Sequence, residues 1–485
     1  MKAISVLGTS SNAGKSWMAT AFCSLLRRKG YKVAPFKAQN MSNNSWVTLG
    51  GGEIGRAQGV QAEACGLLPD VMMNPLLLKP SGPKGSQLIV NGKAEGHFTS
   101  REYYEEISRL WQKVLEALEH WKNQCDVLVL EGAGSPVELN LMDRDLVNLK
   151  PIEYLDGRWL LVADIERGGV FAQIAGTWAL MSEAHQQRSL GYIVNKFRGD
   201  LSLFEGADVY LKDHVQGPYL GVLPYRNDLP IESEDSLCAH AETQGNKEEA
   251  FFAWVRFPRI SNSQDIQPWM NDSGVEQRWV TTPSELEKAK ALILPGSKNT
   301  LSDLAWLRNS GLDEAIKRQA AQGVPIVGIC GGYQMLGRSI VDVMGHGGEQ
   351  GQYDGLNLLP LRTEFAECKT VNVIQAGYKN EQWEAYEIHM GQTTHEGKLP
   401  ALLKIKDGNQ WIEEGVCEKN IWGTYLHGLF ESPLVRGELA RLAGLENFTV
   451  AKETWRSRQE KIYQHMADCL EEHLNLNALY AYVEH

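Results

Sequence analysis

Short apolar runs alternate along this chain with longer segments in which apolar residues recur at helical spacing. The first run, residues 3–7, ends at Gly8, and a helical pattern follows over 16–29 before Gly30 ends it. Further apolar runs lie at 32–36, 126–130, 159–163, 191–194 and 219–223, with a long helical pattern at 101–121. Buried strands that alternate with helices predict a mainly parallel sheet with helices on both faces.

This pattern breaks between Ile231 and Glu249, where the chain is polar and acidic and has no apolar period, as is typical of a domain boundary. Further apolar runs follow at 251–256, 291–294 and 325–329, and the end of the chain is helical in pattern over 434–474. We predict an α/β fold with two domains, 1–235 and 250–440, each a mainly parallel sheet with helices on both faces. A helical extension over 441–485 is expected to pack on the second domain.

The composition fits a globular protein and narrows the choice of partners. The chain has 485 residues, of which 43% are apolar and 22% charged, enough for two or three domains. Its 48 basic and 60 acidic residues leave a net charge of −12, so we expect no nucleic acid and no membrane as partner. The eight cysteines are dispersed, and no apolar stretch approaches the about 20 residues of a membrane helix. We expect a cytoplasmic protein with reduced thiols.

A glycine-rich turn joins the first predicted strand to the first predicted helix. Residues 8–16 read GTSSNAGKS, a Gly-x5-Gly-Lys-Ser pattern one residue longer than the common phosphate-binding loop. We expect the backbone N–H groups between Gly8 and Gly14 to surround a phosphate, with Lys15 on its outer oxygens. The Ser16 hydroxyl would bind Mg²⁺. The alternative, a glycine-rich turn with a surface lysine, fits the flanking strand and helix less well.

Polar residues end several of the predicted strands. Glu131 ends the run DVLVLE, Lys37 and Asn195 end two others, and Asp164 ends a fourth. The carboxyl ends of parallel strands meet at one edge of a sheet, where ligands bind. We therefore predict that Lys37 and Asn195 contact the nucleotide and that Glu131 joins Ser16 at the metal. A solvated strand cap is the alternative for each of them.

A second motif lies in the second half of the chain. Residues 325–337 read PIVGICGGYQMLG, an apolar strand that runs into Cys330 between glycines and then into a helical pattern. Such an elbow exposes a nucleophile and directs backbone N–H groups toward an oxyanion, while the helix N-terminus favours the thiolate. A buried structural cysteine is the alternative. A cysteine nucleophile needs a base, and of the two candidates, His427 and His389, we favour His427.

Longer strings extend both motifs. The elbow and the string TYLHG around His427 resemble the glutamine amidotransferase domain of the class I, or triad, family. The phosphate loop, the string EGAG and Lys37 resemble a dethiobiotin synthetase-like ATP domain. Both domains in this order resemble the cobyric acid synthase family. Its matching strings are KAQNMSNNS (37–45), GEIGRAQ (52–58), NPLLLKP (74–80), GAGSPVELNL (132–141), VADIERGGVFA (162–172), NKFRGD (195–200), LPGSKNT (294–300) and YEIHMG (386–391).

The resemblance implies a reaction and its residues. Such enzymes use glutamine and MgATP to amidate the b, d, e and g side-chain carboxylates of adenosylcobyrinic acid a,c-diamide, a corrinoid. By this resemblance Cys330 forms a glutamyl thioester and His427 carries the proton. The ATP domain phosphorylates a corrinoid carboxylate, and ammonia then displaces the phosphate. The residues expected to hold glutamine or its oxyanion are Gly296, Gly331, Gly332 and Gln334.

One position departs from the triad pattern. Triad amidotransferases carry a Glu two residues after the catalytic histidine, and here Leu429 occupies that position. We therefore expect a Cys/His dyad that hydrolyses glutamine slowly until ATP and the acceptor are bound, with the direction of Glu431 left open. A polar set is expected to bind the corrinoid or the nucleotide, with a helix cap or turn as the alternative: Gln39, Asn40, Asn43 and Asn44.

Two other functions stay open at this point. The sister enzymes that amidate the a and c carboxylates of cobyrinic acid share both chemistries, but the strings VADIERGGVFA and NKFRGD favour the first interpretation. A nucleotide-dependent switch that resembles the partitioning ATPases, with a degenerate amidase domain, is the more distant alternative. Those proteins usually carry a second lysine early in the phosphate loop, where this chain has Ser10 and Ser11.

Overall fold

The chain forms two compact units, each built around a six-stranded, mainly parallel sheet. The computed structural model describes residues 1–80, 85–204, 206–231, 250–345, 347, 350–395 and 397–485. The first unit comprises Met1–Ser42, Glu53–Glu232 and Arg458–His485, and the second comprises Asn43–Gly52 and Ser233–Ser457. The predicted α/β class is confirmed. The predicted boundary segment, 231–249, lies outside the described residues from 232 onward.

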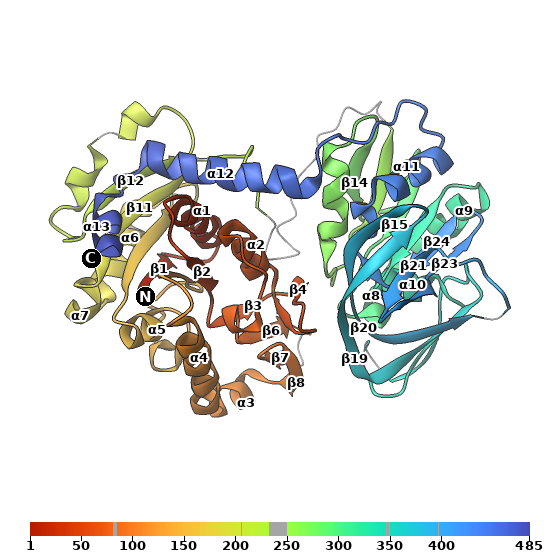
Figure 1. Ribbon diagram of the computed structural model, residues 1–485, viewed down its shortest axis with the longest axis horizontal. Helices are drawn as coiled ribbons and strands as arrows, with labels where there is room; N and C mark the ends of the chain where they lie inside the picture. Colours follow the sequence, from red (N-terminus) through yellow and green to blue (C-terminus); the bar gives the residue numbers. More distant parts are fainter. Residues whose placement is uncertain (81–84, 205, 232–249, 346, 348–349, 396) are drawn as a thin grey trace. The chain divides into compact units, whose positions relative to one another are not determined.

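The sheet of the first unit is parallel throughout, in the order β12-β11-β10-β1-β9-β2 (Figure 1). Its strands are β1 (Lys2–Gly8), β2 (Val33–Phe36), β9 (Val127–Glu131), β10 (Arg158–Asp164), β11 (Ser189–Phe197) and β12 (Tyr219–Pro224). Each contains one of the apolar runs seen in the sequence, because both faces of the sheet are covered. The carboxyl ends of β1, β9 and β10 lie in register and place the phosphate loop beside Glu131.

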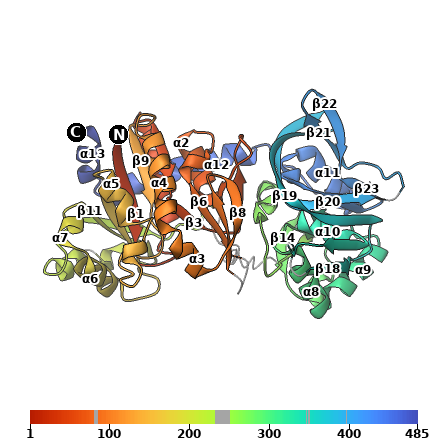
Figure 2. The same ribbon diagram turned by 90° about the horizontal axis from the view of Figure 1, so that it is seen from below.

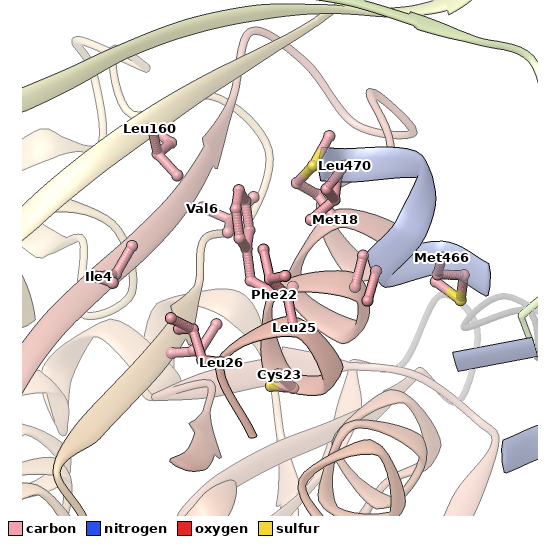
Figure 3. Packing of buried hydrophobic residues seen from close by; sticks show 14 of the residues in the cluster. Ile4, Val6, Met18, Phe22, Cys23, Leu25, Leu26, Leu160, Met466 and Leu470 are labelled. Atoms are coloured by element: carbon pink, nitrogen blue, oxygen red, sulfur yellow. The ribbon is translucent and has the colours of Figure 1, made fainter. Parts of the chain in front are cut away.

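Helices cover both faces of this sheet. They are α1 (Lys15–Arg28), α2 (Arg56–Cys65), α4 (Ile107–Trp121), α5 (Leu149–Tyr154), α6 (Val170–Leu180) and the short α7 (Glu183–Gln186). The cluster on one face joins Ile4 and Val6 of β1 to Phe22 of α1 (Figure 3), and on the other face α4 packs on β2 and β9. In α4, buried residues recur at helical spacing, so its apolar stripe faces the sheet.

The end of the chain completes the core of the first unit. The helices α12 (Trp455–His473) and α13 (Asn477–Glu484) follow the helical pattern predicted there. Met466 and Leu470 of α12 are fully buried in the same cluster as Met18 and Phe22 of α1 (Figure 3). Arg28 adds ion pairs from α1 to this helix. The expectation that the helical extension packs on the second domain is therefore wrong from Arg458 onward.

A smaller four-stranded sheet extends the first unit, in the order β3-β6-β7-β8. Its strands are β3 (Gln39–Met41), β6 (Leu76–Pro80), β7 (Ser86–Val90) and β8 (Lys93–Phe98), followed by α3 (Ser100–Glu105), with β5 (Glu53–Gly55) before α2. A buried ion pair between Lys79 of β6 and Glu53 of β5 lies beside it. The edge strand β8 is largely exposed, as expected of a sheet margin.

The sheet of the second unit has the order β14-β13-β15-β16-β24-β23, and only the edge strand β23 is antiparallel. Its strands are β13 (Phe251–Val255), β14 (Glu276–Val280), β15 (Ala291–Leu294), β16 (Ile326–Ile329), β23 (Val416–Glu418) and β24 (Ile421–Thr424). The helices α8 (Thr300–Asn309), α9 (Leu312–Ala321) and α10 (Gly331–Leu336) cover one face.

A second, largely antiparallel sheet covers the other face, together with α11 (Pro433–Leu442). Figure 2 shows β21 and β22 on the opposite side of this unit from α8 and α9. Its strands are β17 (Ser339–Asp342), β18 (Gly351–Asp354), β19 (Leu361–Tyr378), β20 (Glu381–His395), β21 (Leu403–Asp407), β22 (Gln410–Glu414) and β25 (Leu426–His427). No sequence pattern predicted this sheet. Its short strand β25 pairs with β20 and ends at His427, which is buried in the core of the unit.

One short segment from early in the chain belongs to the second unit. Residues 43–52, which the sequence places inside the first domain, contain β4 (Ser45–Val47) and a turn closed by Thr48, whose N–H donates to the Gly52 oxygen at 2.8 Å. Among the described residues, no helix combines the length and the apolar character needed to cross a membrane.

Candidate active sites

The phosphate loop connects β1 to α1, as the sequence predicts. Gly14 is the N-cap of α1 with a φ of 103°, a conformation that glycine adopts without strain. Lys15 curls back over the loop, and its Nζ donates to the backbone oxygens of Ser10 at 2.9 Å and Gly134 at 3.1 Å. A Cβ on Gly8 would lie 3.0 Å from the Lys15 side chain, so glycine leaves room for the lysine. The loop thus forms a cradle suited to phosphates.

Glu131 is the centre of a buried polar cluster at the carboxyl edge of this sheet. Its Oε1 accepts hydrogen bonds from Ser16 Oγ at 2.8 Å and from Lys37 Nζ at 2.9 Å, and its Oε2 accepts from Gln61 Nε2 at 2.5 Å. Burial alone would raise the pKa of Glu131, but Lys37 and these hydrogen bonds hold it below its ordinary value. The carboxylate is therefore charged beside the phosphate loop.

The pair of Ser16 and Glu131 fits the donor chemistry of Mg²⁺. Both side chains offer hard oxygen atoms, 2.8 Å apart, at the end of the loop that would hold phosphates. Lys37 shares the same carboxylate oxygen and therefore competes with a metal ion there. Among the described residues, no three His, Cys, Asp or Glu side chains gather as a metal cluster, so a metal here would need oxygen atoms from the nucleotide or water.

A cavity of about 240 Å³ opens beside the loop. It is lined by Gly14 and Trp17 of the loop and first helix, by Asn195 and Lys196, and by residues 224–227 and 229–231. Asn195 Nδ2 donates to the Ala13 oxygen at 2.9 Å and lies against Gly14, where any Cβ would clash with it. Asn195 thus fixes the floor of the cavity next to the phosphate cradle, in keeping with its predicted place at the nucleotide.

The other polar residues predicted at this edge have defined partners. Asp164 forms an ion pair with Lys196 at 2.9 Å. Gln39 accepts a hydrogen bond from the Tyr103 hydroxyl, and Asn40 Nδ2 donates to Gln58 Oε1 at 2.8 Å. Asn43 and Asn44 belong to the second unit, so the predicted corrinoid set of Gln39, Asn40, Asn43 and Asn44 is not one group within either unit.

The elbow of the second unit has the predicted form. Cys330 follows β16 with φ 52° and ψ −108°, a strained conformation for a residue with a side chain, and α10 begins immediately after it. Its N–H donates to the Thr424 oxygen at 2.8 Å. A Cβ on Gly332 would lie 1.9 Å from the Leu294 oxygen, so glycine is required for this approach. The strain directs the Cys330 side chain toward β20 and β25, where its Sγ contacts the Ile388 oxygen at 3.5 Å.

The residues predicted to hold glutamine or its oxyanion divide into two groups. Gly332 N–H donates to the Pro295 oxygen at 3.1 Å and is already engaged. Gln334 is buried, with Oε1 accepting from Thr300 Oγ1 at 2.8 Å and Nε2 donating to Tyr425 at 3.5 Å, so it holds the elbow together. Gly331 lies at the first turn of α10, where N–H groups have no intrahelical partner. Gly296 lies against the His427 ring, where a Cβ would approach Cε1 to 2.9 Å.

His427 is the histidine that the structure brings to Cys330. Its Nδ1–H donates to Asp265 Oδ2 at 2.8 Å, and both side chains are fully buried. Burial would lower the pKa of His427, but the charge of Asp265 and hydrogen bonds to Asp265 and Cys330 raise it to about 10. The expected Cys/His dyad lacks no carboxylate in the structure, because Asp265 contacts His427 from elsewhere in the chain, while Leu429 is buried in the core.

His389, the alternative base, has a different environment. Its Nδ1 donates to the Gly391 oxygen at 2.8 Å, and its ring stacks on Tyr425 with centroids 3.8 Å apart. Burial lowers the pKa of His389 to about 4, so the ring is neutral. It has no carboxylate partner among its described contacts, which favours His427 as the base.

Asp265 was missed by the sequence analysis. It lies in the 3-10 segment Ser263–Asn271, which follows β13 and approaches the carboxyl edge of the sheet. The string SNSQD after an apolar strand was a usable signal, since polar residues past strand ends meet at that edge. Cys330, His427 and Asp265 together form an arrangement that can activate a thiol for acyl transfer.

Comparisons with known proteins agree with both halves of this description. A CobQ/CobB/MinD/ParA nucleotide binding domain matches residues 4–237, and a CobB/CobQ-like glutamine amidotransferase domain matches residues 252–435. A protein of Nocardia farcinica named cobyric acid synthase is 42% identical over 98% of this chain and 96% of its own length. Proteins of the same name from Nostoc punctiforme and Clostridium botulinum are 41% and 40% identical, over 98% and 100% of this chain and 99% of each relative.

Proposed function

Because the chain belongs to the cobyric acid synthase family, we propose that it amidates the b, d, e and g side-chain carboxylates of adenosylcobyrinic acid a,c-diamide with glutamine and ATP. The observation that carries this proposal is the buried set of Cys330, His427 and Asp265 in a chain that also holds a phosphate loop. A degenerate amidase domain, as the switch alternative requires, would not keep such a set.

Glutamine is the nitrogen donor in this proposal. The Cys330 thiol gives its proton to His427 Nε2, and the sulfur attacks the side-chain amide carbon. The N–H groups of Gly331 and Gly296 are the proposed donors to the oxyanion. His427 returns the proton to the leaving nitrogen, so ammonia departs and a glutamyl thioester remains. Water then hydrolyses the thioester to glutamate and restores the thiol.

ATP activates the acceptor. A carboxylate is a poor electrophile, and transfer of the γ-phosphoryl group to its oxygen creates a good leaving group. Lys15 and the N–H groups of the loop neutralise the phosphates, and the cavity beside Gly14 and Asn195 receives the purine base. Ammonia attacks the acyl phosphate, the C–N bond forms, and inorganic phosphate leaves.

Mg²⁺ completes the nucleotide site in this proposal, held by Ser16 and Glu131. When bound, it offsets the charge of the transferring phosphoryl group. Lys37 Nζ donates to Glu131 Oε1 at 2.9 Å and shares this carboxylate. Lys37, at the same edge of the sheet, would contact the phosphates beside the metal.

The test is mass spectrometry of adenosylcobyrinic acid a,c-diamide incubated with MgATP and a nitrogen source. The wild type should add four amides with glutamine. Cys330→Ala should add none with glutamine and four with ammonium, and Lys15→Ala should add none with either. Absence of amidation with every nitrogen source would overturn the proposal, and the same assay with cobyrinic acid would then identify the a,c-diamide reaction.

A further inference from the structure

Asn262 lies between the catalytic histidine and the segment that the first half of the chain contributes to the second unit. It is buried and adopts a left-handed conformation, with φ 55° and ψ 53°. Its Nδ2 lies 3.5 Å from His427 Nε2, the nitrogen that must take the proton of Cys330. An amide group at this position is close enough to Nε2 to act on the proton transfer.

Residues 43–45 fix the orientation of this amide. The Ser45 N–H donates to Asn262 Oδ1 at 3.0 Å, so the oxygen of the amide points to the segment and its N–H points to His427. The Asn262 backbone N–H donates to Asn44 Oδ1 at 3.1 Å, and Ser261 Oγ donates to the Asn43 oxygen at 3.1 Å. The hydrogen bond from Ser45 thus determines which end of the amide faces the imidazole, and the other two hold residues 261 and 262 against the segment.

The direction of this amide opposes the catalytic state. His427 Nδ1–H is committed to Asp265, so whenever the ring is neutral its Nε2 has the lone pair that takes the thiol proton. The Asn262 N–H competes for that lone pair. Once Nε2 is protonated, two N–H donors face each other, which disfavours the imidazolium beside the Cys330 thiolate.

We propose that Asn262 is a brake on glutamine hydrolysis, held in place by residues 43–45 and released when that segment moves. This inference rests on the proposed role of Cys330 and His427. It supplies a physical reason for slow basal hydrolysis in a site whose imidazole is well oriented by Asp265.

The segment has a covalent route from the nucleotide site. Ser42, whose N–H donates to the Leu78 oxygen at 3.0 Å, ends β3, and the next peptide bond leads to Asn43. Within the first unit, Asn40 of β3 donates to Gln58, whose Nε2 lies 3.5 Å from Glu131 Oε2. A shift of β3 on binding of MgATP and corrinoid would therefore reach Asn44 along the chain and turn the amide away from Nε2.

The test measures glutamate release in the absence of ATP and corrinoid. Asn262→Ala should raise this basal rate about fivefold, the equivalent of one ordinary hydrogen bond. It should also raise the rate at which iodoacetamide alkylates Cys330, followed by peptide mass spectrometry. With all substrates present, it should release more than one glutamate per amide formed. Loss of a merely structural contact would lower these rates, so their rise is specific to a brake.

Matched variants separate the possible outcomes. Asn420→Ala removes an asparagine hydrogen bond to Gly323 at the opposite end of β24 and should leave the basal rate unchanged. Asn44→Ala should raise the rate, and Asn44→Asp, which keeps the acceptor oxygen, should restore it. An unchanged or lower basal rate in Asn262→Ala and Asn44→Ala would overturn the brake. Cys330→Ala tests the proposed function separately, because glutaminase activity that survives in it would overturn the site itself.

Discussion

Asp265 determines the proton arrangement of the glutaminase site. One of its carboxylate oxygens accepts His427 Nδ1–H, and the other accepts the Gly428 N–H at 2.7 Å. Because both oxygens are fixed, the imidazole is held with Nε2 toward Cys330, and the neutral ring has its lone pair on that nitrogen. A single side chain thus selects the tautomer and the ring direction.

Asp265→Asn tests this role. The amide can present an N–H to Nδ1 and shift the ring proton to Nε2, so we expect glutamine-dependent turnover to fall by roughly 10³–10⁴-fold. Ammonium-dependent amidation should persist. Asp407→Asn, at the exposed end of β21, is the control and should behave as wild type. Activity of Asp265→Asn within threefold of wild type would show that Cys330 and His427 suffice.

Glu414 gives the second unit a pH-dependent stability. Burial raises the pKa of Glu414 from 4.5 to about 7, although hydrogen bonds from Thr424 and Tyr425 lower it. The folded state therefore favours the protonated carboxyl, and this stabilisation is complete below pH 4.5 and is lost as the pH rises through 7. Relative to Glu414→Gln, the wild type should lose about 3 kcal/mol of unfolding free energy across this window. Denaturant titrations at several pH values measure this loss of unfolding free energy, with the exposed Glu413→Gln as control. If the unfolding free energies of Glu414→Gln and the wild type change with pH in the same way, the prediction is contradicted.

Among single residues, the sequence indicated those that belong to a short, recognisable motif. Cys330 and Lys15 stand in short strings that place a side chain and its backbone surroundings together. Asp265 does not, because its partner is 162 residues away and only the fold joins them. The same holds for Asn262, which no motif marks.

Two glycines within helices differ in whether the structure leaves room for a side chain. A Cβ on Gly332 would overlap the Leu294 oxygen, since α10 starts against the end of β15. Gly176, in the middle of α6, has open space around its hypothetical Cβ. The same change to alanine should therefore destabilise the protein at Gly332 and stabilise it at Gly176.

Gly332→Ala should lower the unfolding free energy of the second unit by about 3 kcal/mol and abolish glutamine hydrolysis, because the elbow must open. Gly176→Ala should instead raise the unfolding free energy of the first unit by about 0.5–1 kcal/mol, because alanine restricts the unfolded chain and favours the helix. Thermal unfolding of both variants measures these changes. A fully active, equally stable Gly332→Ala enzyme would show that the close approach is dispensable.

Apolar runs predicted the parallel strands because those strands are buried on both faces, as β1, β9, β10 and β16 are. The hairpin of β19 and β20 escaped prediction because one of its faces meets the core while the other is polar. Its register is fixed by long-range packing and not by a local run. The antiparallel sheet that contains β19 and β20 was therefore seen only in the structure.

The two units exchange segments along the chain. The chain leaves the first unit after Ser42, returns at Glu53, leaves again and ends in it from Arg458. No composition change marks the excursion over 43–52. The sequence therefore indicated two α/β domains, but neither this insertion nor the return of the last helices.

A substitution at Met466 tests how strongly the stability of the first unit depends on α12. Its side chain is fully buried against α1, so Met466→Ala should cost about 2–5 kcal/mol. Ammonium-dependent amidation should then fail at a lower temperature than glutamine hydrolysis does. Met270→Ala, at an exposed position of the second unit, is the control. Equal heat sensitivity of both activities in Met466→Ala would show that the units do not unfold separately.

The closing helices also impose an order on synthesis. A growing polypeptide emerges from the ribosome with its phosphate loop first, yet the cluster under α1 lacks Met466 and Leu470 until the final stretch has been translated. The amidotransferase half, with residues 43–52 already available, can complete its own core earlier. Completion of the first core therefore depends on Met466 and Leu470, whereas the second unit needs no residue after Ser457.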